Sequence, residues 1–386
     1  MKPIPERLRI AVFNRVFSPT GGGAERYSIA LVEQLAARHE VHVFAQQIEH
    51  AWPGVTYHKV SSPMTRPRWA NLFWYAAATW WATRKGFDIV HSHESTWQGQ
   101  VQTVHVLPMK YSLFIGRSGL QLALRVLKVV TSPRLLAYLL LERTRFAPRS
   151  DRFVVVTSPM LKGVVARTYP ASRLAVIFPG VNLSDASGSR HSARVSLNLP
   201  QNGKLLAFIA NDYGKKGLAT LLEALVLLPK DFLLAVVGNP IYIKEFSGLA
   251  EQLGVGSRVY FLGHLPDVSP LYEAADVLAH PTLEDTFAMV VLEAMAHGLP
   301  VVVSDERYCG IAGLLTHGVN ALILSSPLNA RELADSLDAV VSDQALRDRL
   351  ADGARQFAAG LSWAAIAKQQ EALYFDIVSG RLNQRV

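Results

Sequence analysis

The feature that most constrains the fold of this chain is a series of short apolar runs without alternation, separated by segments of helix length. Runs such as Arg9–Arg15 and Lys204–Asp212 are rich in valine, isoleucine, leucine, alanine and phenylalanine. Strands buried on both faces have this composition, because neither face meets water. Strands that alternate with helical segments indicate parallel sheets covered by helices on both sides. The pattern therefore predicts an α/β protein with doubly wound, Rossmann-like parallel sheets.

The apolar runs fall into two groups, which predicts two sheets. The runs of the first group are Arg9–Arg15, Glu40–Gln46, Asp88–Glu94, Gly99–His105, Arg152–Ser158 and Leu174–Gly180. Those of the second are Lys204–Asp212, Phe232–Asn239, Arg258–His264, Ala275–Pro281, Pro300–Asp305 and Ala321–Leu324. A polar stretch rich in serine and asparagine, Leu183–Gly203, separates the groups and predicts the domain boundary. The chain has 386 residues, which suits two domains.

Cysteine and hydropathy exclude several protein classes. Cys309 is the single cysteine of the sequence, which excludes an intrachain disulfide and a zinc site built from cysteines. The longest apolar segment, Gly119–Glu142, is interrupted by charges and a proline, so we expect no transmembrane helix. The first residues lack the pattern of a signal peptide, and we expect a cytoplasmic protein.

The positive charge of the chain is concentrated in one segment. The net charge is +8, and Leu107–Arg152 alone holds nine basic and two acidic residues. Such a patch suits an anionic partner: lipid, nucleic acid or a phosphorylated substrate. Nucleic acid is disfavoured, because these basic residues are interleaved with leucine and valine.

The same segment contains an amphipathic pattern that allows two interpretations. If Ser112–Val130 is one helix, its leucines at 113, 120, 124 and 127 lie within about 60° of one another, and the basic residues at 117, 125 and 128 lie toward one side of them. The leucine stripe either inserts into an anionic membrane surface, with Met109–Arg145 as the docking segment, or packs into the domain core. The aromatic run Trp69–Trp81 has the same two interpretations.

A glycine-rich turn follows the first predicted strand. Gly21, Gly22 and Gly23 lead into a helix expected to begin near Ala24. Glycines let a ligand approach the backbone, and a helix N-terminus offers unpaired N–H groups to an anion. The alternative is a tight turn without a ligand. The spacing matches neither the dinucleotide fingerprint nor the phosphate-binding loop of nucleotide triphosphatases.

The strongest chemical pattern is the segment ADVLAHPTLEDTFAMVVLEAMAHGLPVVVSD, residues 275–305. A strand ends at Pro281 and a helix is expected from about Phe287 to Gly298. Asp285 and Glu293 are eight residues apart, which along a helix places them about 12 Å and about 80° apart. A ligand with an anionic centre between hydroxyl groups would suit two such carboxylates. The alternative is that Asp285 caps the helix and Glu293 is solvated, although Glu293 lies in an apolar stretch where an unpaired charge is costly.

This pattern resembles the E-x7-E motif of the retaining glycosyltransferases of family 4, which have the two-domain GT-B fold. GG-AER at 22–26, FDIVHSHES at 87–95 and the final helix from Leu361 also resemble family motifs. Because that helix crosses back in GT-B proteins, the resemblance implies an acceptor-binding domain of residues 1–183 with 363–386. It implies a donor-binding domain of residues 184–362, with a cleft between the two. Lipopolysaccharide-core α-glucosyltransferases are the subfamily with the most similar motifs.

The resemblance assigns roles to residues that match the family motifs. Lys216 would bind a phosphate oxygen of a nucleotide-sugar donor, Asp285 the sugar hydroxyls and Glu293 the ribose hydroxyls. His105 would lie near the reacting sugar. The donor diphosphate and sugar would face the backbone of Gly22, Gly23, Phe287, Ala288 and Met289.

Three departures from the family pattern concern the donor site. Asp285 replaces a glutamate, and Glu284 is an alternative for the same position. Two motif glycines are replaced by Thr286 and Ala288, which restricts positive φ angles. A family arginine is replaced by Asn211, and Lys215 would supply the missing charge as a second donor-binding lysine.

The resemblance implies retaining transfer of a hexose to a glycolipid, lipopolysaccharide or polysaccharide-precursor acceptor. UDP-glucose is the favoured donor, with other UDP- or GDP-hexoses possible. No D-x-D motif follows a strand, so we expect neither a metal nor another cofactor, and lysines would stabilise the leaving diphosphate. We expect the enzyme on the inner face of the cytoplasmic membrane, without a nucleic-acid partner. Two alternatives are a catalytically silent nucleotide-sugar-binding protein at the membrane and a UDP-sugar 2-epimerase.

Overall fold

The computed structural model describes residues 6–19, 22–64, 66–183 and 188–380, so Gly21 of the glycine-rich turn lies outside the described residues. The chain divides into two compact units. Unit 1 consists of Met1–Gly180 and Trp363–Val386, and unit 2 of Val181–Ser362. The sequence placed these divisions after residue 183 and before residue 363.

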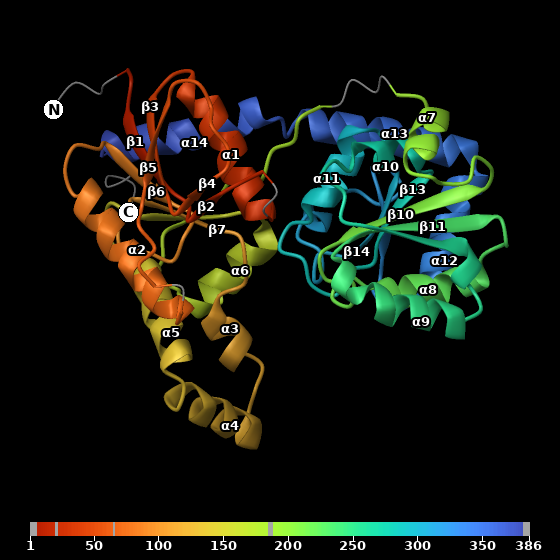
Figure 1. Ribbon diagram of the computed structural model, residues 1–386, viewed down its shortest axis with the longest axis horizontal. Coiled ribbons are helices and arrows are strands. Elements are labelled where there is room, and N and C mark those ends of the chain that lie inside the picture. Colours follow the sequence, from red (N-terminus) through yellow and green to blue (C-terminus); the bar gives the residue numbers. More distant parts are fainter. Residues whose placement is uncertain (1–5, 20–21, 65, 184–187, 381–386) are drawn as a thin grey trace. The chain divides into compact units, whose positions relative to one another are not determined.

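Unit 1 contains a parallel sheet of seven strands in the order β5-β3-β1-β6-β7-β8-β9 (Figure 1). These strands are β1 (Arg9–Phe13), β3 (Glu40–Ala45), β5 (Val55–Lys59), β6 (Ile89–Ser92), β7 (Val101–Val104), β8 (Phe153–Val156) and β9 (Leu174–Val176). A short parallel pair, β2 (Val16–Phe17) and β4 (Gln47–Ile48), accompanies the sheet. The helices are α1 (Gly23–Ala36), α2 (Arg68–Thr83), α3 (Met109–Phe114), α4 (Gly119–Val130), α5 (Pro133–Arg145), α6 (Pro159–Thr168) and α14 (Trp363–Val378).

Unit 2 contains a parallel sheet of six strands in the order β12-β11-β10-β13-β14-β15. They are β10 (Lys204–Ala210), β11 (Phe232–Gly238), β12 (Val259–Gly263), β13 (Val277–His280), β14 (Val301–Ser304) and β15 (Leu322–Leu324). The helices are α7 (Arg190–Ser196), α8 (Leu218–Leu227), α9 (Ile243–Gln252), α10 (Ser269–Ala274), α11 (Met289–Ala296), α12 (Ala330–Ser342) and α13 (Gln344–Ala359), with 3₁₀ turns at Pro240–Tyr242, Gly256–Arg258 and Ala312–Leu314.

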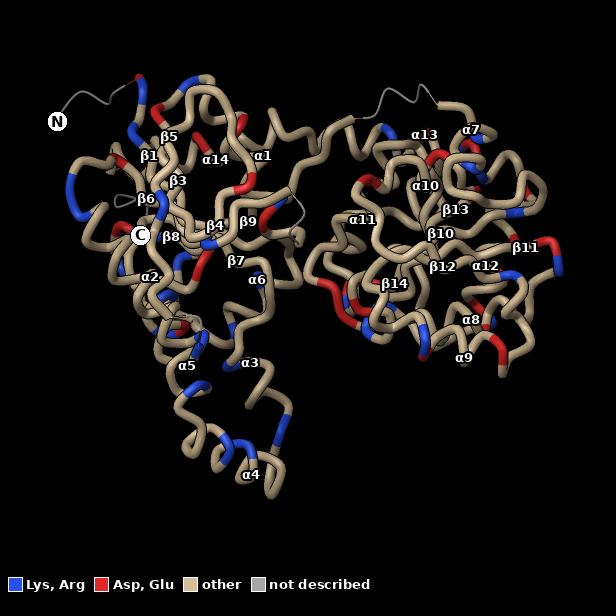
Figure 2. Tube along the Cα trace, in the orientation of Figure 1, with Lys and Arg blue, Asp and Glu red and all other residues tan. Residues whose placement is uncertain are grey.

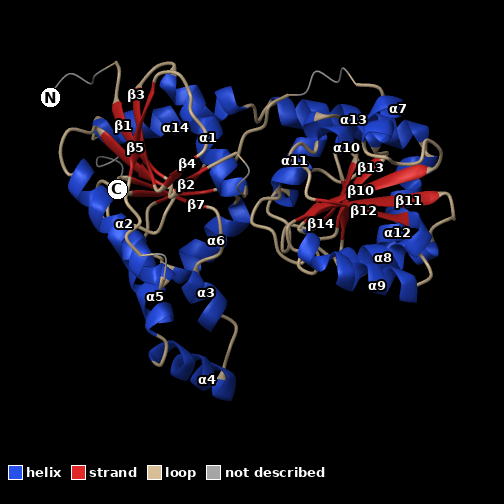
Figure 3. Cartoon of the chain, viewed as in Figure 1, coloured by secondary structure: helices blue, strands red, loops and turns tan. Residues whose placement is uncertain are grey.

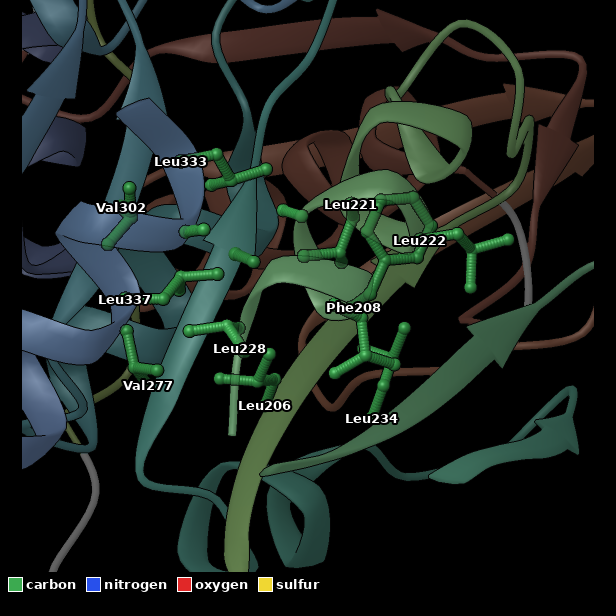
Figure 4. Packing of buried hydrophobic residues seen from close by; sticks show 14 of the residues in the cluster. Leu206, Phe208, Leu221, Leu222, Leu228, Leu234, Val277, Val302, Leu333 and Leu337 are labelled. Atoms are coloured by element: carbon green, nitrogen blue, oxygen red, sulfur yellow. The ribbon is translucent and has the colours of Figure 1, made fainter. Parts of the chain in front are cut away.

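Helices cover both faces of the sheet in unit 2 (Figure 3). On one face, α8, α9 and α12 bury apolar side chains against β10 and β11. Leu221 of α8, Leu337 of α12 and Phe208 of β10 belong to this cluster (Figure 4). Because both faces are covered, the strands carry apolar side chains on both sides, as their composition indicated. The predicted doubly wound parallel architecture is confirmed in both units.

The final helix belongs to unit 1 although it follows unit 2 in the chain. α14 packs against α1, and the ring of Trp363 lies 5.4 Å from that of Tyr27. The hydroxyl of Tyr374 is 2.6 Å from Nδ1 of His91 on β6. Aromatic packing and a buried polar contact therefore attach this helix to the first sheet.

The segment between β7 and β8 differs from the expectation of one helix over 112–130. The structure has two helices in its place. α3 ends at Phe114, the chain turns at Gly116, which has a φ of 77°, and α4 begins at Gly119. α3, α4 and α5 extend from unit 1, with α4 at the end remote from the sheet (Figure 1). Among the described residues, no helix has both the length and the apolar composition needed to span a membrane.

The leucine stripe of α4 is exposed. Leu120, Leu124 and Leu127 expose 75%, 57% and 61% of their surface, and Val129 is the buried residue of this helix. The interpretation that these leucines belong to the core of unit 1 is therefore wrong. In α2 the aromatic run divides, because Trp69 and Phe73 are half-buried whereas Trp80 is exposed.

Candidate active site

The polar groups of unit 2 gather where the order of its strands reverses. β10 and β13 are neighbours in the sheet, but they lead to helices of opposite faces. Ligands of doubly wound folds bind at the carboxyl ends of such a strand pair. Lys216 follows β10 and Asp285 follows β13, and the two side chains form an ion pair of 2.7 Å. The structure thus brings together two predicted residues that are far apart in sequence.

Gly217 allows the lysine loop to pass closely over the end of β13. Its φ is 81°, and a Cβ atom at this position would lie 2.0 Å from the carbonyl oxygen of Pro281. The loop is also joined to the β13 side by backbone hydrogen bonding, since the N–H of Leu283 donates to the carbonyl of Lys215. Lys216 is therefore held against the segment that contains Asp285.

The ammonium group of Lys216 has two protein partners. Nζ donates to the carbonyl oxygen of Glu284 and to Oδ2 of Asp285, both at 2.7 Å. An ammonium group has three donors, so the third can bind an anion such as phosphate. The side chain is about one-fifth exposed, which places a positive charge in a partly desolvated position where it acts strongly.

Asp285 lies in the turn before α11, not on the helix, so the predicted helical spacing to Glu293 does not apply. Its Oδ1 accepts hydrogen bonds from the N–H groups of Phe287 and Ala288, at 3.2 and 2.7 Å. Its Oδ2 accepts from Lys216 and is 3.3 Å from Nε2 of His280. Because both N–H groups precede α11, whose first residue is Met289, the interpretation that Asp285 caps this helix is wrong, and the carboxylate instead closes the turn before it.

The environment of Asp285 favours its charged form. Burial by itself raises the pKa of this carboxyl, but the hydrogen bond from His280 and the charge of Lys216 outweigh burial. The pKa is held well below its usual range. Burial is also the main reason why the pKa of His280 is lowered, so this histidine is neutral and its Nε2–H donates to Asp285.

The N–H groups of Phe287 and Ala288 differ from the expectation that they face the donor. Both donate to Asp285 Oδ1, so the carboxylate of this turn, and not a ligand, accepts from them in this structure. α11 begins at Met289, two residues later than predicted. Ala288 has a φ of 73° and a ψ of 70°, so this alanine adopts the left-handed conformation that a family glycine adopts easily.

The two neighbouring acidic residues have different environments. The side chain of Glu284 is about half exposed and lies 3.4 Å from Nζ of the exposed Lys215. Asp285 is mostly buried, and its backbone is paired with the loop after β14, because its N–H donates to the carbonyl of Tyr308. Of the two, Asp285 is the carboxylate inside the site.

Glu293 is half-buried in α11 and is oriented by a residue that the sequence did not identify. The hydroxyl of Tyr272, on α10, donates to Oε2 of Glu293 at 2.9 Å. The Tyr272 ring is buried and lies 5.1 Å from that of His297. The interpretation of Glu293 as a solvated side chain is therefore wrong. The sequence of its helix, SPLYEA, contains no motif that would have identified Tyr272.

Unit 1 contains the other predicted residues at the carboxyl edge of its sheet. Gly22 precedes α1, whose first residue is Gly23, and the φ of Gly22 is −76°, which any residue can adopt. His105 follows β7 and stacks on His93, which follows the neighbouring β6. His93 Nδ1 lies 3.1 Å from His105 Nε2.

Burial and a buried cation keep these histidines neutral. Burial lowers the pKa of His105 to about 3, with a further contribution from Arg145. Arg145, at the end of α5, donates to the backbone carbonyls of His93 and Thr103. Tyr27 of α1 packs its ring 5.0 Å from that of His105. His93 and Arg145 are neighbours of His105 that the sequence did not identify.

Among the described residues, no group of three or more histidine, cysteine, aspartate or glutamate side chains is placed to hold a metal ion.

Known proteins resemble this chain over much of its length. Lipopolysaccharide glucosyltransferase WaaG of Escherichia coli K12 is 33% identical over 187 residues, which cover 47% of this chain and 49% of that protein. D-inositol 3-phosphate glycosyltransferase of Xylanimonas cellulosilytica is 34% identical over 245 residues, 58% of this chain and 57% of that protein. The matched stretches thus span about half the length of these relatives.

Solved structures show the same fold. The crystal structure of WaaG, a glycosyltransferase involved in lipopolysaccharide biosynthesis, superposes with a TM-score of 0.78 at 24% identity, over 96% of this chain and 100% of that one. The structure of Anabaena Alr3699/HepE in complex with UDP and glucose gives a TM-score of 0.72 at 20% identity, over 95% and 99% of the two chains.

Two family models match successive parts of the sequence. "Glycosyltransferase Family 4" matches residues 21–185, and "Glycosyl transferases group 1" matches residues 189–357. Together they extend through most of both units. The chain belongs to the family 4, group 1 glycosyltransferases, and its two parallel sheets are those of the GT-B fold.

Proposed function

We propose that this protein is a retaining glycosyltransferase that transfers a hexose from a nucleotide sugar to a membrane-associated glycolipid, lipopolysaccharide or polysaccharide precursor. The main support is the ammonium group of Lys216. It is held between β10 and β13, where the strand order of unit 2 reverses, and one of its three N–H groups is left to bind an anion. UDP-glucose is the favoured donor, because Anabaena HepE has been crystallised with it and WaaG is named a glucosyltransferase. The acceptor class rests on the names of relatives alone, which include inositol phosphate as well as lipopolysaccharide.

The proposed mechanism uses the protein's own cations. Lys216, assisted by the exposed Lys215, would neutralise the charge that develops on the diphosphate as the sugar bond breaks. The acceptor hydroxyl would attack on the face that the nucleotide leaves, and the departing phosphate oxygen would take its proton. His105, neutral because of burial, would contact the reacting sugar as a hydrogen-bonding group and not as an acid. Turnover is therefore expected to be equal in magnesium and in excess EDTA.

Binding measurements with variants test the donor assignment. We expect Lys216→Ala to weaken binding of the preferred UDP- or GDP-hexose roughly tenfold or more, because a charge-assisted contact is worth about 1.5–3 kcal/mol. Glu293→Gln should weaken binding similarly, but have little effect on a donor that lacks the ribose hydroxyls. Lys230→Ala, which removes an exposed lysine before β11, is the matched control. Unchanged affinity in both site variants, with melting temperatures intact, would refute the assignment.

Product analysis separates the proposed activity from its alternatives. A glycosyltransferase releases nucleoside diphosphate in the presence of an acceptor. A 2-epimerase converts the donor to its C2 epimer without one, and a silent binding protein yields neither product. The assay is run on the full chain with a lipid-linked glycan acceptor mixture. Its outcome assigns the chain to one of the three classes.

We also propose that α4 docks the enzyme on an anionic membrane surface at the cytoplasmic side. The exposed face of the helix combines Leu120, Leu124 and Leu127 with Lys128, and Arg125 beside them is half-buried. Figure 2 shows basic residues along α3, α4 and α5, with few acidic ones. An exposed apolar stripe beside cations suits the interface of an anionic bilayer, where each cation contributes about 1 kcal/mol.

Liposome co-sedimentation tests the docking surface. Binding should require anionic lipid and weaken with salt. It should decrease at least tenfold when charges on the segment are reversed by Arg117→Glu, Arg125→Glu and Lys128→Glu. The control reverses the same number of exposed charges in unit 2, with Lys230→Glu, Lys244→Glu and Arg331→Glu. Equal binding to neutral vesicles, or a concentration-dependent dimer without vesicle binding, would exclude the electrostatic membrane interaction.

A further inference from the structure

The carboxylate of Asp285 has no lone pair left for a sugar. A carboxylate offers about four acceptor sites. Two of these sites accept the N–H groups of Phe287 and Ala288, and two face Lys216 and His280. A contact with a donor hydroxyl would have to replace one of these hydrogen bonds.

The length of the side chain explains why the carboxylate turns inward. Aspartate readily accepts hydrogen bonds from backbone N–H groups two and three residues ahead, whereas glutamate carries its carboxylate one methylene farther out. The turn formed here contains Ala288 at a φ of 73°, a strained conformation for an alanine. The 2.7 Å hydrogen bond to the Ala288 N–H holds the chain in that conformation.

We infer that Asp285 is a positioning residue that acts through Lys216 and the turn before α11, and that it does not contact the sugar. This role rests on the proposed function, because it requires Lys216 to bind the donor diphosphate. Asp285 directs one donor of the ammonium group inward, and the Glu284 carbonyl directs a second. The third N–H of the ammonium group is thereby oriented toward the diphosphate, while other groups bind the hydroxyls of the sugar.

The role has a consequence that a sugar contact would not have. UDP and UDP-glucose share the diphosphate and differ in the sugar. Asp285→Asn keeps an oxygen for the turn N–H groups but replaces the anionic partner of Lys216 with an amide. The affinity for the nucleotide and for the nucleotide sugar should therefore fall by the same factor, roughly tenfold. A residue that contacts sugar hydroxyls would affect the nucleotide sugar alone.

Isothermal titration with a double-mutant cycle tests this role. Wild type, Asp285→Asn, Lys216→Ala and the double variant are titrated with UDP, UDP-glucose, GDP and GDP-mannose. We expect equal losses for nucleotide and nucleotide sugar in Asp285→Asn. In the Lys216→Ala background, Asp285→Asn should change affinity less than twofold. The cycle compares matched backgrounds, so a general loss of stability in Asp285→Asn appears in both arms and is checked by thermal melting.

The outcomes separate this role from the proposed function. A loss confined to the nucleotide sugars, unchanged affinity in Asp285→Asn, or additive effects in the double variant would each overturn the positioning role while leaving Lys216 as the phosphate ligand. Unchanged affinity in Lys216→Ala, or no binding of any of the four ligands to the wild type, would overturn the proposed donor site and the positioning role with it.

Discussion

At the scale of single residues, the proposed donor site contains a local backbone strain that the neighbouring contacts maintain. Ala288 is left-handed, and its N–H bonds to Asp285 while its carbonyl accepts from Val291 in the first turn of α11. Left-handed geometry costs an alanine roughly 1–2 kcal/mol. A glycine has no such cost.

Ala288→Gly should therefore stabilise unit 2 by about 1 kcal/mol. The matched control is Ala294→Gly, in the interior of the same helix, which should destabilise by about 1 kcal/mol or more because the site is helical and buried. Urea unfolding followed by circular dichroism measures both variants. If Ala288→Gly left the midpoint unchanged or lowered it, the strain argument would fail.

At the scale of elements, the site depends on the close approach of two loops. The loop between β10 and α8 crosses the end of β13 at Gly217, where a side chain would collide with the Pro281 carbonyl. Lys216 is the preceding residue, so its place beside Asp285 depends on this crossing. The neighbouring Gly214 lies in the same loop without a positive φ, and a Cβ there would meet Asp212 at 3.6 Å, an ordinary contact.

Gly217→Ala should destabilise unit 2 by at least about 2 kcal/mol and weaken nucleotide binding, because relief of the clash moves Lys216. Gly214→Ala, in the same loop, should change both quantities little. The measurements are urea unfolding by circular dichroism and nucleotide titration of the folded variants. Similar effects of the two substitutions would show that the loop crossing does not control the site.

At the scale of the whole molecule, the buried histidines make the stability of unit 1 sensitive to acid. Burial lowers the pKa of His91 and of His105 to about 3, from 6.5 in the unfolded chain, and lowers that of His93 well below 6.5. The unfolded chain therefore binds more protons than the folded chain between pH 6.5 and about 3. Stability is retained above pH 6.5 and falls as the pH decreases through this window.

Inside this window, each of these histidines should lower the free energy of unfolding by about 1.4 kcal/mol for every pH unit of acidification. The free energy of unfolding of unit 1 should fall by several kcal/mol between pH 7.5 and pH 5.5. Tryptophan fluorescence measures this unit selectively, because all seven tryptophans of the sequence lie within residues 1–180 and 363–386. His91→Asn should reduce the slope of the unfolding free energy against pH by the contribution of one histidine, about 1.4 kcal/mol per pH unit. The same slope in that variant would contradict the assignment to buried histidines.

Much of the fold followed from local patterns. Runs apolar on both faces, such as Ile10–Phe13 in β1, are recognisable without any partner strand, because burial on both sides removes polar alternation. The edge strand β5, Val55–Lys59, was missed because its side chains are half-buried or exposed and its sequence VTYHK is mostly polar. The motif around Asp285 and Glu293 is the source of the proposed site of unit 2, where the structure places Asp285 beside Lys216 and Glu293 beside Tyr272.

The sequence by itself determined where the strands buried on both faces lie and which residues follow them, since both depend on neighbours along the chain. Only the tertiary structure decided what those side chains meet. Leu120, Leu124 and Leu127 of α4 are exposed among the described residues, whereas the fourth leucine of the predicted stripe lies in α3. Asp285 and Lys216 come together because β10 and β13 are adjacent. The carboxylate then accepts hydrogen bonds from the N–H groups of its own turn and from that lysine. Such contacts join groups far apart in sequence, and therefore no local pattern contains them.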